Sequence, residues 1–361
     1  MEKTLSIIVP TYNMEKYLRK CLDSLIVSDE NMQRLEVLVI NDGSKDSSSQ
    51  IAHEYEAKYP QIFRVIDKEN GNYGSCINRG LKEATGKYVK VLDADDYFNP
   101  QVLDDFISYL GDTDVDLVIS DFNVVDEDGT CLSEFTFDLP LKREFKLKDI
   151  PNEMNTKLFH QCITYKRKVF DRFSFRQTEG ISYTDDEWIF KPMMWIDAVT
   201  YYPHTLYLYL RGREGQTFDP NVIKRTLEHR VIVAKEMVEF YYENISKCKR
   251  ENIPFVTEKL IRRLRAVYNY HIIRFPQEEN KKRIVEFDSY LKQRLPLVYD
   301  GLNLITNNFG WHYIRQWRKL WHSDFTPEVA FIRLKYRINR KIKPNNVQVD
   351  RMPVNLKRKS L

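Results

Sequence analysis

A group of carboxylates follows one of the apolar segments of the sequence. Asp93, Asp95 and Asp96 fall within four residues, directly after residues 88–92. Three carboxylates at this spacing repel one another unless a cation neutralises them. Oxygen ligands suit Mg²⁺ or Mn²⁺, which also bridge the phosphates of a bound nucleotide. Taken alone, the cluster favours a metal site no more strongly than a solvated acidic loop that caps the helix near Pro100.

Two further polar clusters have side chains that suit a flat base. At Pro10-Thr11-Tyr12-Asn13, a backbone turn and a small hydroxyl can approach a nucleobase. In Asn41-Asp42-Gly-Ser44, Asp42 can accept a hydrogen bond from a pyrimidine N–H. Each cluster also has a structural explanation, because Asn13 can cap a helix and residues 41–44 can form a tight turn. Separately, the structural explanations are favoured.

Short apolar segments alternate with helix-like ones over the first 120 residues and position these clusters. We expect strands at 5–9, 35–40, 63–66, 88–92 and 115–119. Helices are expected from Asn13 to about 26, from about 45 to 58, and from the turn at Gly71 and Gly74 to about 84. This alternation predicts an α/β fold with a mostly parallel sheet covered by helices. Ligands bind beyond the carboxyl ends of such strands, where all three clusters fall.

Jointly the clusters are more specific than each is alone. Pro-Thr-Tyr-Asn, Asn-Asp-Gly-Ser, Lys-Glu-Asn-Gly-Asn-Tyr-Gly at 68–74 and Leu-Asp-Ala-Asp-Asp at 92–96 follow one another at successive strand ends. In this order the chain resembles the family-2 glycosyltransferases of the GT-A fold that build bacterial polysaccharides. The resemblance is dense over residues 4–122 and thinner to about 217. It implies a Rossmann-like domain that binds a nucleotide-sugar.

The resemblance also implies roles for individual residues. Its nucleotide-binding positions correspond here to Pro10, Thr11, Tyr12, Asp42, Lys68 and Asp93. Asp95, with Asp93 beside it, matches the metal ligand of the family's Asp-x-Asp motif, so Mg²⁺ or Mn²⁺ is the expected cofactor. One departure is Tyr73, which is bulkier than the usual residue of its segment and puts the sugar selectivity in question.

A second acidic segment, Thr184-Asp185-Asp186-Glu187, precedes a helix-like run at 188–195. It resembles the acidic pair from which the family draws its general base. Inverting transfer needs a carboxylate that removes the acceptor hydroxyl's proton as that oxygen attacks the anomeric carbon. We place the base at Asp186, with Asp185 as the alternative. Without the upstream motifs, acids stabilised at a helix N-terminus would be the simpler explanation.

Two arginines, Arg211 and Arg213, flank a glycine after the aromatic segment 206–210. Forked guanidinium donors suit a departing diphosphate, so this loop can clamp it. The loop resembles a basic loop that follows the catalytic domain in some family members. A surface salt-bridge loop is nearly as well supported.

Composition restricts the class of protein and its location. Apolar residues make up 42% of the chain and charged residues 30%, as in an ordinary globular protein. The five cysteines are scattered and lack Cys-x-x-Cys spacing, which argues against a disulfide framework or a zinc site. The first residues run directly into a strand-like segment, leaving no room for a signal peptide, and no apolar stretch reaches about 18 residues. The expected location is the cytoplasm.

The last 35 residues differ in charge from the rest of the chain. Residues 327–361 contain ten Lys or Arg and two acids, a balance of +8, whereas the preceding 326 residues have a balance of −4. On a helical wheel one stripe contains Phe331, Leu334, Ile338 and Ile342. This pattern predicts either a basic amphipathic helix at the inner face of the cell membrane or a helix packed on protein. Nucleic-acid binding is disfavoured, because no recognised binding module accompanies the basic residues.

These features predict a GT-A domain at 1–217, with nucleotide-sugar binding at 1–122 and the acceptor and base region at 123–217. A helical region at 218–326 and a basic tail at 327–361 follow. The expected reaction is the inverting transfer of a sugar from a nucleoside-diphosphate sugar, with UDP as the favoured nucleotide. The expected acceptor is a hydroxyl of a lipid-linked saccharide or a related cell-envelope precursor. The alternatives are a sugar nucleotidyltransferase, which should begin with a glycine-rich phosphate loop, and a nucleotide-sugar-binding subunit that supports a partner enzyme.

Overall fold

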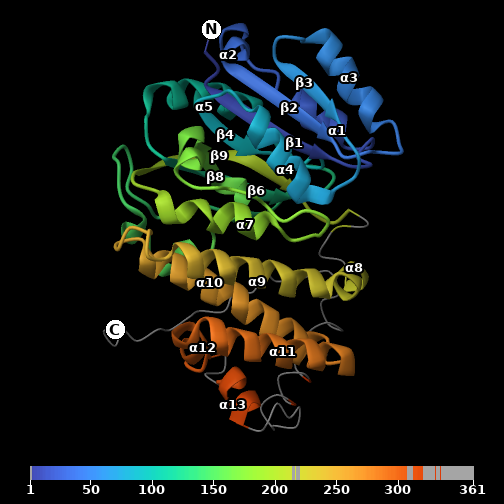
Figure 1. The fold of residues 1–361 in the computed structure, drawn as a ribbon. Helices are drawn as coiled ribbons and strands as arrows, with labels where there is room; N and C mark the ends of the chain where they lie inside the picture. Colours follow the sequence, from blue (N-terminus) through green and yellow to red (C-terminus); the bar gives the residue numbers. More distant parts are fainter. Residues whose placement is uncertain are drawn as a thin grey trace. The chain divides into compact units, whose positions relative to one another are not determined.

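A computed structural model describes residues 2–213, 216, 220–306, 312–319, 330 and 334 of the chain. The chain forms two compact units (Figure 1). The first contains Met1–Glu214 and Cys248–Phe255, and the second contains Gly215–Lys247 and Val256–Leu361. Most of the predicted basic tail, including Phe331, Ile338 and Ile342, lies outside the described residues.

The first unit is an α/β domain around one mixed sheet (Figure 1). Its strands are β1 (Leu5–Thr11), β2 (Leu35–Asn41), β3 (Phe63–Asp67), β4 (Tyr88–Val91), β5 (Tyr97–Phe98), β6 (Leu117–Val125), β7 (Cys131–Phe135), β8 (Ile163–Lys166) and β9 (Val199–Leu210). The strand order is β3-β2-β1-β4-β8-β6-β9-β5, with β7 paired to β6. The neighbours β3, β2, β1 and β4 are parallel, as are β6 and β9, whereas β8 is antiparallel to β4 and β6. The five strands expected from the sequence are all present.

Helices cover the sheet and approach it closely where the sequence allows. The helices of the first unit are α1 (Leu18–Asp23), α2 (Asp29–Arg34), α3 (Ser48–Lys58), α4 (Asn72–Glu83), α5 (Pro100–Asp112), α6 (Asn152–Asn155) and α7 (Asp185–Phe190), with 3-10 helices η1 (Leu147–Asp149), η2 (His160–Cys162), η3 (Arg167–Arg172) and η4 (Pro192–Trp195). α4 packs on β1 and β2. A Cβ at Gly80 would lie 2.4 Å from Cγ2 of Ile8, so only glycine permits this approach.

One helix begins later than the sequence indicated. Asn13 does not cap it, because its backbone is left-handed (φ 54°) and its Oδ1 accepts a hydrogen bond from the Lys45 N–H at 2.8 Å. The chain makes a turn before α1 starts at Leu18. The prediction of a helix from Asn13 to about 26 was therefore wrong, because this asparagine bonds to the next loop instead.

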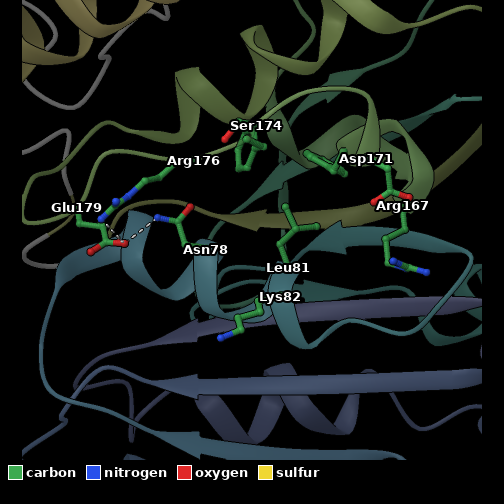
Figure 2. Close-up of a pocket in the computed structure, with 10 residues that line it drawn as sticks. Asn78, Leu81, Lys82, Arg167, Asp171, Ser174, Arg176 and Glu179 are labelled. Carbon is green, nitrogen blue, oxygen red and sulfur yellow. Dashed lines mark hydrogen bonds and ion pairs between the residues drawn. The ribbon is translucent and has the colours of Figure 1, made fainter.

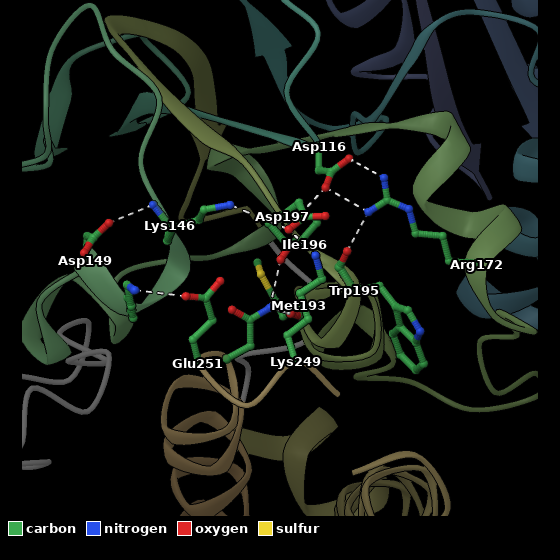
Figure 3. A network of polar contacts seen from close by, with 12 residues as sticks. Asp116, Lys146, Asp149, Arg172, Met193, Trp195, Ile196, Asp197, Lys249 and Glu251 are labelled. Carbon is green, nitrogen blue, oxygen red and sulfur yellow. Dashed lines mark hydrogen bonds and ion pairs between the residues drawn. The ribbon is translucent and has the colours of Figure 1, made fainter. Parts of the chain in front are cut away.

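The segment Cys248–Phe255 belongs to the first unit although it lies between helical regions (Figure 3). Nδ2 of Asn252 donates to the carbonyl of Ile196 at 2.8 Å, and Lys249 forms an ion pair with Asp197. Arg172 forms two hydrogen bonds with Asp116, at 2.7 and 2.8 Å, beside the same turn. A few polar contacts thus hold this segment in the first unit. The sequence pattern did not indicate that the chain comes back to this unit.

The second unit is helical. Its elements are α8 (Pro220–Arg225), α9 (Leu227–Asn244), α10 (Ile253–Tyr268), a π-helical turn (Asn269–Arg274), α11 (Glu278–Arg294), α12 (Pro296–Leu302) and α13 (Tyr313–Lys319). A buried cluster of Ile223, Leu227, Tyr270 and Phe275 forms part of its core. Among the described helices, none combines the length and hydrophobicity that crossing a bilayer requires.

Candidate functional site

The carboxyl ends of β1, β2 and β4 meet at one edge of the sheet, because the three strands are parallel neighbours. Thr11 lies opposite Asn41, and the Asp42 N–H donates to the Thr11 carbonyl at 2.8 Å. The Leu92 N–H likewise donates to the Ile8 carbonyl at 3.0 Å, which brings Asp93 to the same edge. The structure thus gathers the polar clusters that the sequence placed at strand ends.

The end of β1 presents one buried hydroxyl and one exposed ring. Pro10 is half-buried, and the buried Thr11 donates its Oγ1 hydrogen to the Val9 carbonyl at 3.2 Å. Tyr12 is 44% exposed. An exposed aromatic ring beside this edge is available to stack on a base.

Asp42 and Lys68 form a tight ion pair at the end of β2. Lys68 Nζ donates to Asp42 Oδ1 at 2.5 Å, and the Gly71 N–H donates to the same oxygen at 2.9 Å. Lys68 also donates to Ser75 Oγ at 2.8 Å. These contacts fix the Asp42 carboxylate and join the two predicted nucleotide contacts to the start of α4.

The glycine-rich segment at the start of α4 has steric reasons for its glycines. A Cβ on Gly74 would lie 2.0 Å from the carbonyl oxygen of Thr178, so no side chain fits there. Asn72, just before it, is left-handed (φ 64°). Tyr73 lies between them on the helix, half-buried, and close enough to Asp93 and Asp185 to feel both charges. The unusual tyrosine of this segment therefore lies near Asp93, one of the predicted nucleotide-binding residues.

The three carboxylates after β4 have three different environments. Asp93 Oδ2 is 3.1 Å from Nε2 of His160, and Asp95 Oδ2 accepts from Arg213 Nε at 2.5 Å. Asp96 is fully buried and accepts from the Tyr207 hydroxyl at 2.5 Å and the Leu210 N–H at 2.7 Å. Asp96 therefore anchors the loop to β9, whereas Asp93 and Asp95 retain partial exposure, at 23% and 12% of their side chains.

Burial and neighbouring charges shift the pKa values of these three carboxyl groups in different directions. Burial, together with the charges of Asp95 and Asp93, raises the pKa of Asp96 well above its usual value. Burial also raises the pKa of Asp95, although Arg213 opposes it. For Asp93 burial acts in the same sense, but the charge and hydrogen bond of His160 outweigh it and lower the pKa. Asp93 is the carboxylate of the three held most firmly in its ionised form.

The second acidic segment forms the first turn of α7. Glu187 is fully buried, where its Oε2 accepts from Lys191 Nζ at 2.5 Å, so it is a structural acid. Asp185 and Asp186 are half-buried. The charge of Asp185 contributes to raising the pKa of both Tyr73 and His160, which border Asp93. Asp185 therefore lies within electrostatic range of the two residues that border Asp93, and Asp186 follows it one helical position, about 100°, further round α7.

The two arginines of the loop after β9 lie at different places. Arg213 pairs with Asp95 and also faces the ring of Tyr17, 5.7 Å from its centroid. The Arg211 N–H donates to the Val125 carbonyl at 2.8 Å, and its half-buried side chain lies near Tyr209. The structure therefore brings Arg213, of the pair, directly to the carboxylate cluster.

Three residues that the sequence did not single out complete this edge. His160 on η2 contacts Asp93, Tyr207 on β9 contacts Asp96, and Lys90 on β4 is fully buried beneath them. A lone histidine and a tyrosine in an aromatic strand carry no pattern of their own. The lysine was visible as one charge within an apolar strand, which is rare in a core.

The groove in Figure 2 lies apart from these residues. It has a volume of about 390 Å³ and is lined by α4, by η3 and by the segment that follows η3, including Asn78, Leu81, Lys82, Phe170, Arg176 and Glu179. Asn78 Nδ2 donates to Glu179 Oε1 at 2.8 Å across it. No residue of the predicted site lines this groove.

The residues present fit a hard divalent cation. Oδ1 of Asp93 is buried and has no hydrogen-bond partner among the residues that the structure describes. Asp95, two residues on, already neutralises a cationic side chain. The described residues contain no group of three or more His, Cys, Asp or Glu arranged to hold a metal ion. Two carboxylates suit Mg²⁺ or Mn²⁺ in a site where phosphates and water supply the other ligands.

The fold and this edge define the class of protein. The structure of S. aureus TarS 1-349 in complex with UDP-GlcNAc matches 93% of this chain and 92% of its own with a TM-score of 0.70 and 20% identity, so the fold is the GT-A glycosyltransferase fold. Residues 6–173 match the model of glycosyl transferase family 2. Residues 6–173 thus form a glycosyl transferase family 2 domain, and the expected resemblance to family-2 glycosyltransferases and the expected GT-A fold are both confirmed.

Curated relatives agree with this assignment. EpsH of Bacillus subtilis (strain 168) is 31% identical over 216 residues, which cover 57% of this chain and 60% of EpsH. Glycosyltransferase GlyG of Streptococcus pneumoniae is 26% identical over 258 residues, which cover 69% of this chain and 81% of GlyG. The chain thus spans less than two thirds of the length of the first of these relatives.

Proposed function

We propose that the protein is a glycosyltransferase that moves one sugar from a UDP-sugar to a hydroxyl acceptor with inversion, in the synthesis of a cell-surface polysaccharide or glycoconjugate. The observation that carries the proposal is the meeting of Asp42, Asp93 and Asp95 at one edge of a GT-A sheet. The charge of Asp185 on α7 acts on Tyr73, which itself interacts with Asp93. UDP-GlcNAc in the TarS structure supports UDP as the nucleotide. In open α/β sheets ligands generally bind beyond the carboxyl ends of the strands, which is where these carboxylates lie.

The donor would be bound along the strand ends. Thr11, Tyr12 and Asp42 would contact the base, with Pro10 shaping the turn and Lys68 fixing Asp42 from the side. Asp93 would accept from a ribose or sugar hydroxyl, for which its ionised state is suited. Arg213, and Arg211 less directly, would bind the diphosphate through forked donors.

Asp93 and Asp95 would hold Mg²⁺ or Mn²⁺, which stabilises the negative charge of a departing diphosphate when bound. The chain's own residues perform the remaining work. They orient the donor, exclude water through the buried loop around Asp96, and supply a carboxylate for the acceptor proton. That proton would pass from the acceptor hydroxyl to Asp186 as the oxygen attacks the anomeric carbon.

Two other functions are less well supported. A sugar nucleotidyltransferase would need a glycine-rich phosphate loop after β1, where this chain has Pro10-Thr11-Tyr12-Asn13. A binding subunit without activity would not need the second acid pair, Asp185 and Asp186 on α7, because no proton has to be removed from an acceptor. The ion pair between Asp95 and Arg213 and the position of Asp185 favour an enzyme over both.

Release of UDP from a donor tests the proposed activity. We expect the purified chain to hydrolyse at least one of a panel of UDP-sugars slowly, and faster when a saccharide acceptor is present, in a metal-dependent manner. A coupled assay for free UDP measures both rates. Formation of pyrophosphate from UTP and a sugar phosphate would instead indicate the nucleotidyltransferase. Tight UDP binding without turnover on any acceptor would indicate the binding subunit.

The acceptor side of the proposal includes a peripheral membrane location. The +8 balance of residues 327–361 would draw the chain to anionic lipid, each basic residue contributing at most about 1 kcal/mol. We expect the full chain to sediment with anionic vesicles, to be released by salt, and not to bind neutral ones. A chain that ends after Asp324 should lose this binding. Equal binding to neutral vesicles, or none lost on truncation, would contradict a membrane role for the tail.

A further inference from the structure

The two oxygens of Asp93 have different surroundings. Oδ2 is 3.1 Å from Nε2 of His160, whereas Oδ1 is buried without a hydrogen-bond partner among the described residues. A buried carboxylate oxygen is rarely left without a donor in a folded protein. His160 therefore holds the carboxylate through Oδ2, and the Tyr73 side chain also interacts with Asp93, while Oδ1 has no hydrogen bond of normal geometry within the described residues.

His160 itself has little freedom to move. It is 6% exposed, and its ring packs edge-on against Tyr207, with 6.2 Å between the ring centres. Tyr207 in turn accepts from the Asp93 N–H at 3.2 Å and donates to Asp96 at 2.5 Å. The imidazole is thus confined by the same tyrosine that holds the carboxylate loop.

The segment that carries His160 is held by a buried lysine of the neighbouring strand β4. Lys90 of β4 is fully buried, and its Nζ donates to the main-chain carbonyls of Gln161 at 2.7 Å and Ile163 at 3.1 Å. A lysine in a core strand is costly unless its ammonium group is paired. Both carbonyls lie within three residues of His160, so the hydrogen bonds of Lys90 hold η2 in place.

We propose that His160 is a positioning residue of the donor site, and that Lys90 supports it. His160 Nε2 fixes the Asp93 carboxylate so that Oδ1 meets a ribose or sugar hydroxyl of a nucleoside-diphosphate sugar. This role rests on the proposed function, since it needs a donor at Asp93. Residues that hydrogen-bond the ligands of a metal commonly change metal affinity or activity by about 10- to 100-fold, and we expect an effect of similar size on donor binding here.

Two replacements of His160 separate positioning from packing. His160→Phe keeps a flat ring and removes the donor, so we expect the KM for the UDP-sugar and the calorimetric Kd of UDP-sugar to rise about tenfold or more. We expect kcat to change by less than about threefold. His160→Gln places an amide donor near the same spot and should recover most of the affinity. Lys90→Met should weaken donor binding in the same direction and by less.

A matched control is Tyr201→Phe. Tyr201 is also a buried hydroxyl that donates to a carboxylate, Asp121 Oδ1, at 2.6 Å, but it lies outside the predicted site. Tyr201→Phe should lower the melting temperature without changing the KM for the UDP-sugar. Unchanged KM and Kd in His160→Phe, or equal losses in the Phe and Gln variants, would overturn the positioning role.

The test also separates this role from the proposed function. If the wild-type chain binds no nucleoside diphosphate or nucleotide-sugar at all, the proposed function fails. The His160–Asp93 pair is then decided by NMR, because the imidazole nitrogen signals of His160 should shift in Asp93→Asn. Signals that stay in place would refute the pair on their own.

Discussion

Asp186→Asn is expected to lower turnover by roughly two to four orders of magnitude while donor affinity changes little. The amide keeps the shape of the side chain but cannot accept the acceptor's proton. Asp185 is assigned to the donor side of the proposed site, since its charge acts on Tyr73 and His160 next to Asp93. The following residue of α7 points about 100° away, which suits a group that meets the acceptor instead.

Asp185→Asn should differ from this pattern in a measurable way. Because Asp185 neighbours the residues around Asp93, its loss should change donor KM more than kcat. Steady-state kinetics of both variants with the same UDP-sugar and acceptor give the comparison. Glu187→Gln is the control, since Glu187 is buried against Lys191 and its loss should lower stability rather than the rate per folded molecule. If Asp185→Asn shows the large loss in kcat, the base is Asp185, and if neither does, the α7 acids lie outside the chemistry.

The sequence predicted the edge of the sheet well because its signals are local. Strands β1, β2 and β4 read as short apolar runs. Thr11 ends β1, Asp42 directly follows β2, and Asp93 lies two residues after β4. Parallel pairing then brings the strand ends together without any further information. Gly74 was also readable as special, although the carbonyl of Thr178 that excludes a side chain there could not be named from the sequence.

The parts that sequence missed depend on contacts between distant segments. His160 reaches Asp93 across 67 residues, and Asn252 reaches Ile196 across 56. Neither residue belongs to a periodic pattern, so nothing in its neighbourhood marks it. The helix expected at Asn13 failed for a similar reason, because a cap and a loop contact use the same side-chain oxygen. The sequence does not distinguish Asp93, Asp95 and Asp96 from one another. Their different hydrogen-bond and ion-pair partners in the structure do.

The second large effect concerns the metal. Arg213 Nε is 2.5 Å from Asp95 Oδ2, so the residue that we propose as a metal ligand is paired with the residue that we propose for the diphosphate. Each of these residues would exchange its present partner when donor and Mg²⁺ or Mn²⁺ bind. The metal alone must compete with Arg213, whereas a diphosphate would draw Arg213 away. We therefore expect metal and nucleoside diphosphate to bind cooperatively.

Calorimetric titration of Mn²⁺ with and without UDP measures this coupling. Wild-type protein should bind Mn²⁺ weakly alone and at least tenfold more tightly with UDP. Asp95→Asn should abolish the coupling and lower kcat by about two orders of magnitude or more, because the charge of the departing diphosphate is then poorly stabilised. Asp112→Asn, the loss of one exposed acid at the end of α5, is the control and should leave both unchanged.

Arg213→Gln supplies the opposite and more discriminating result. Without its guanidinium, Asp95 no longer has to release an ion-pair partner, so Mn²⁺ alone should bind more tightly than to the wild type. UDP should bind more weakly, because the forked donor for its diphosphate is gone. A variant that weakens both ligands together would mean that Arg213 only maintains the loop. Coupling that survives in Asp95→Asn, or full turnover in excess chelator, would show that the carboxylates after β4 do not act through a metal.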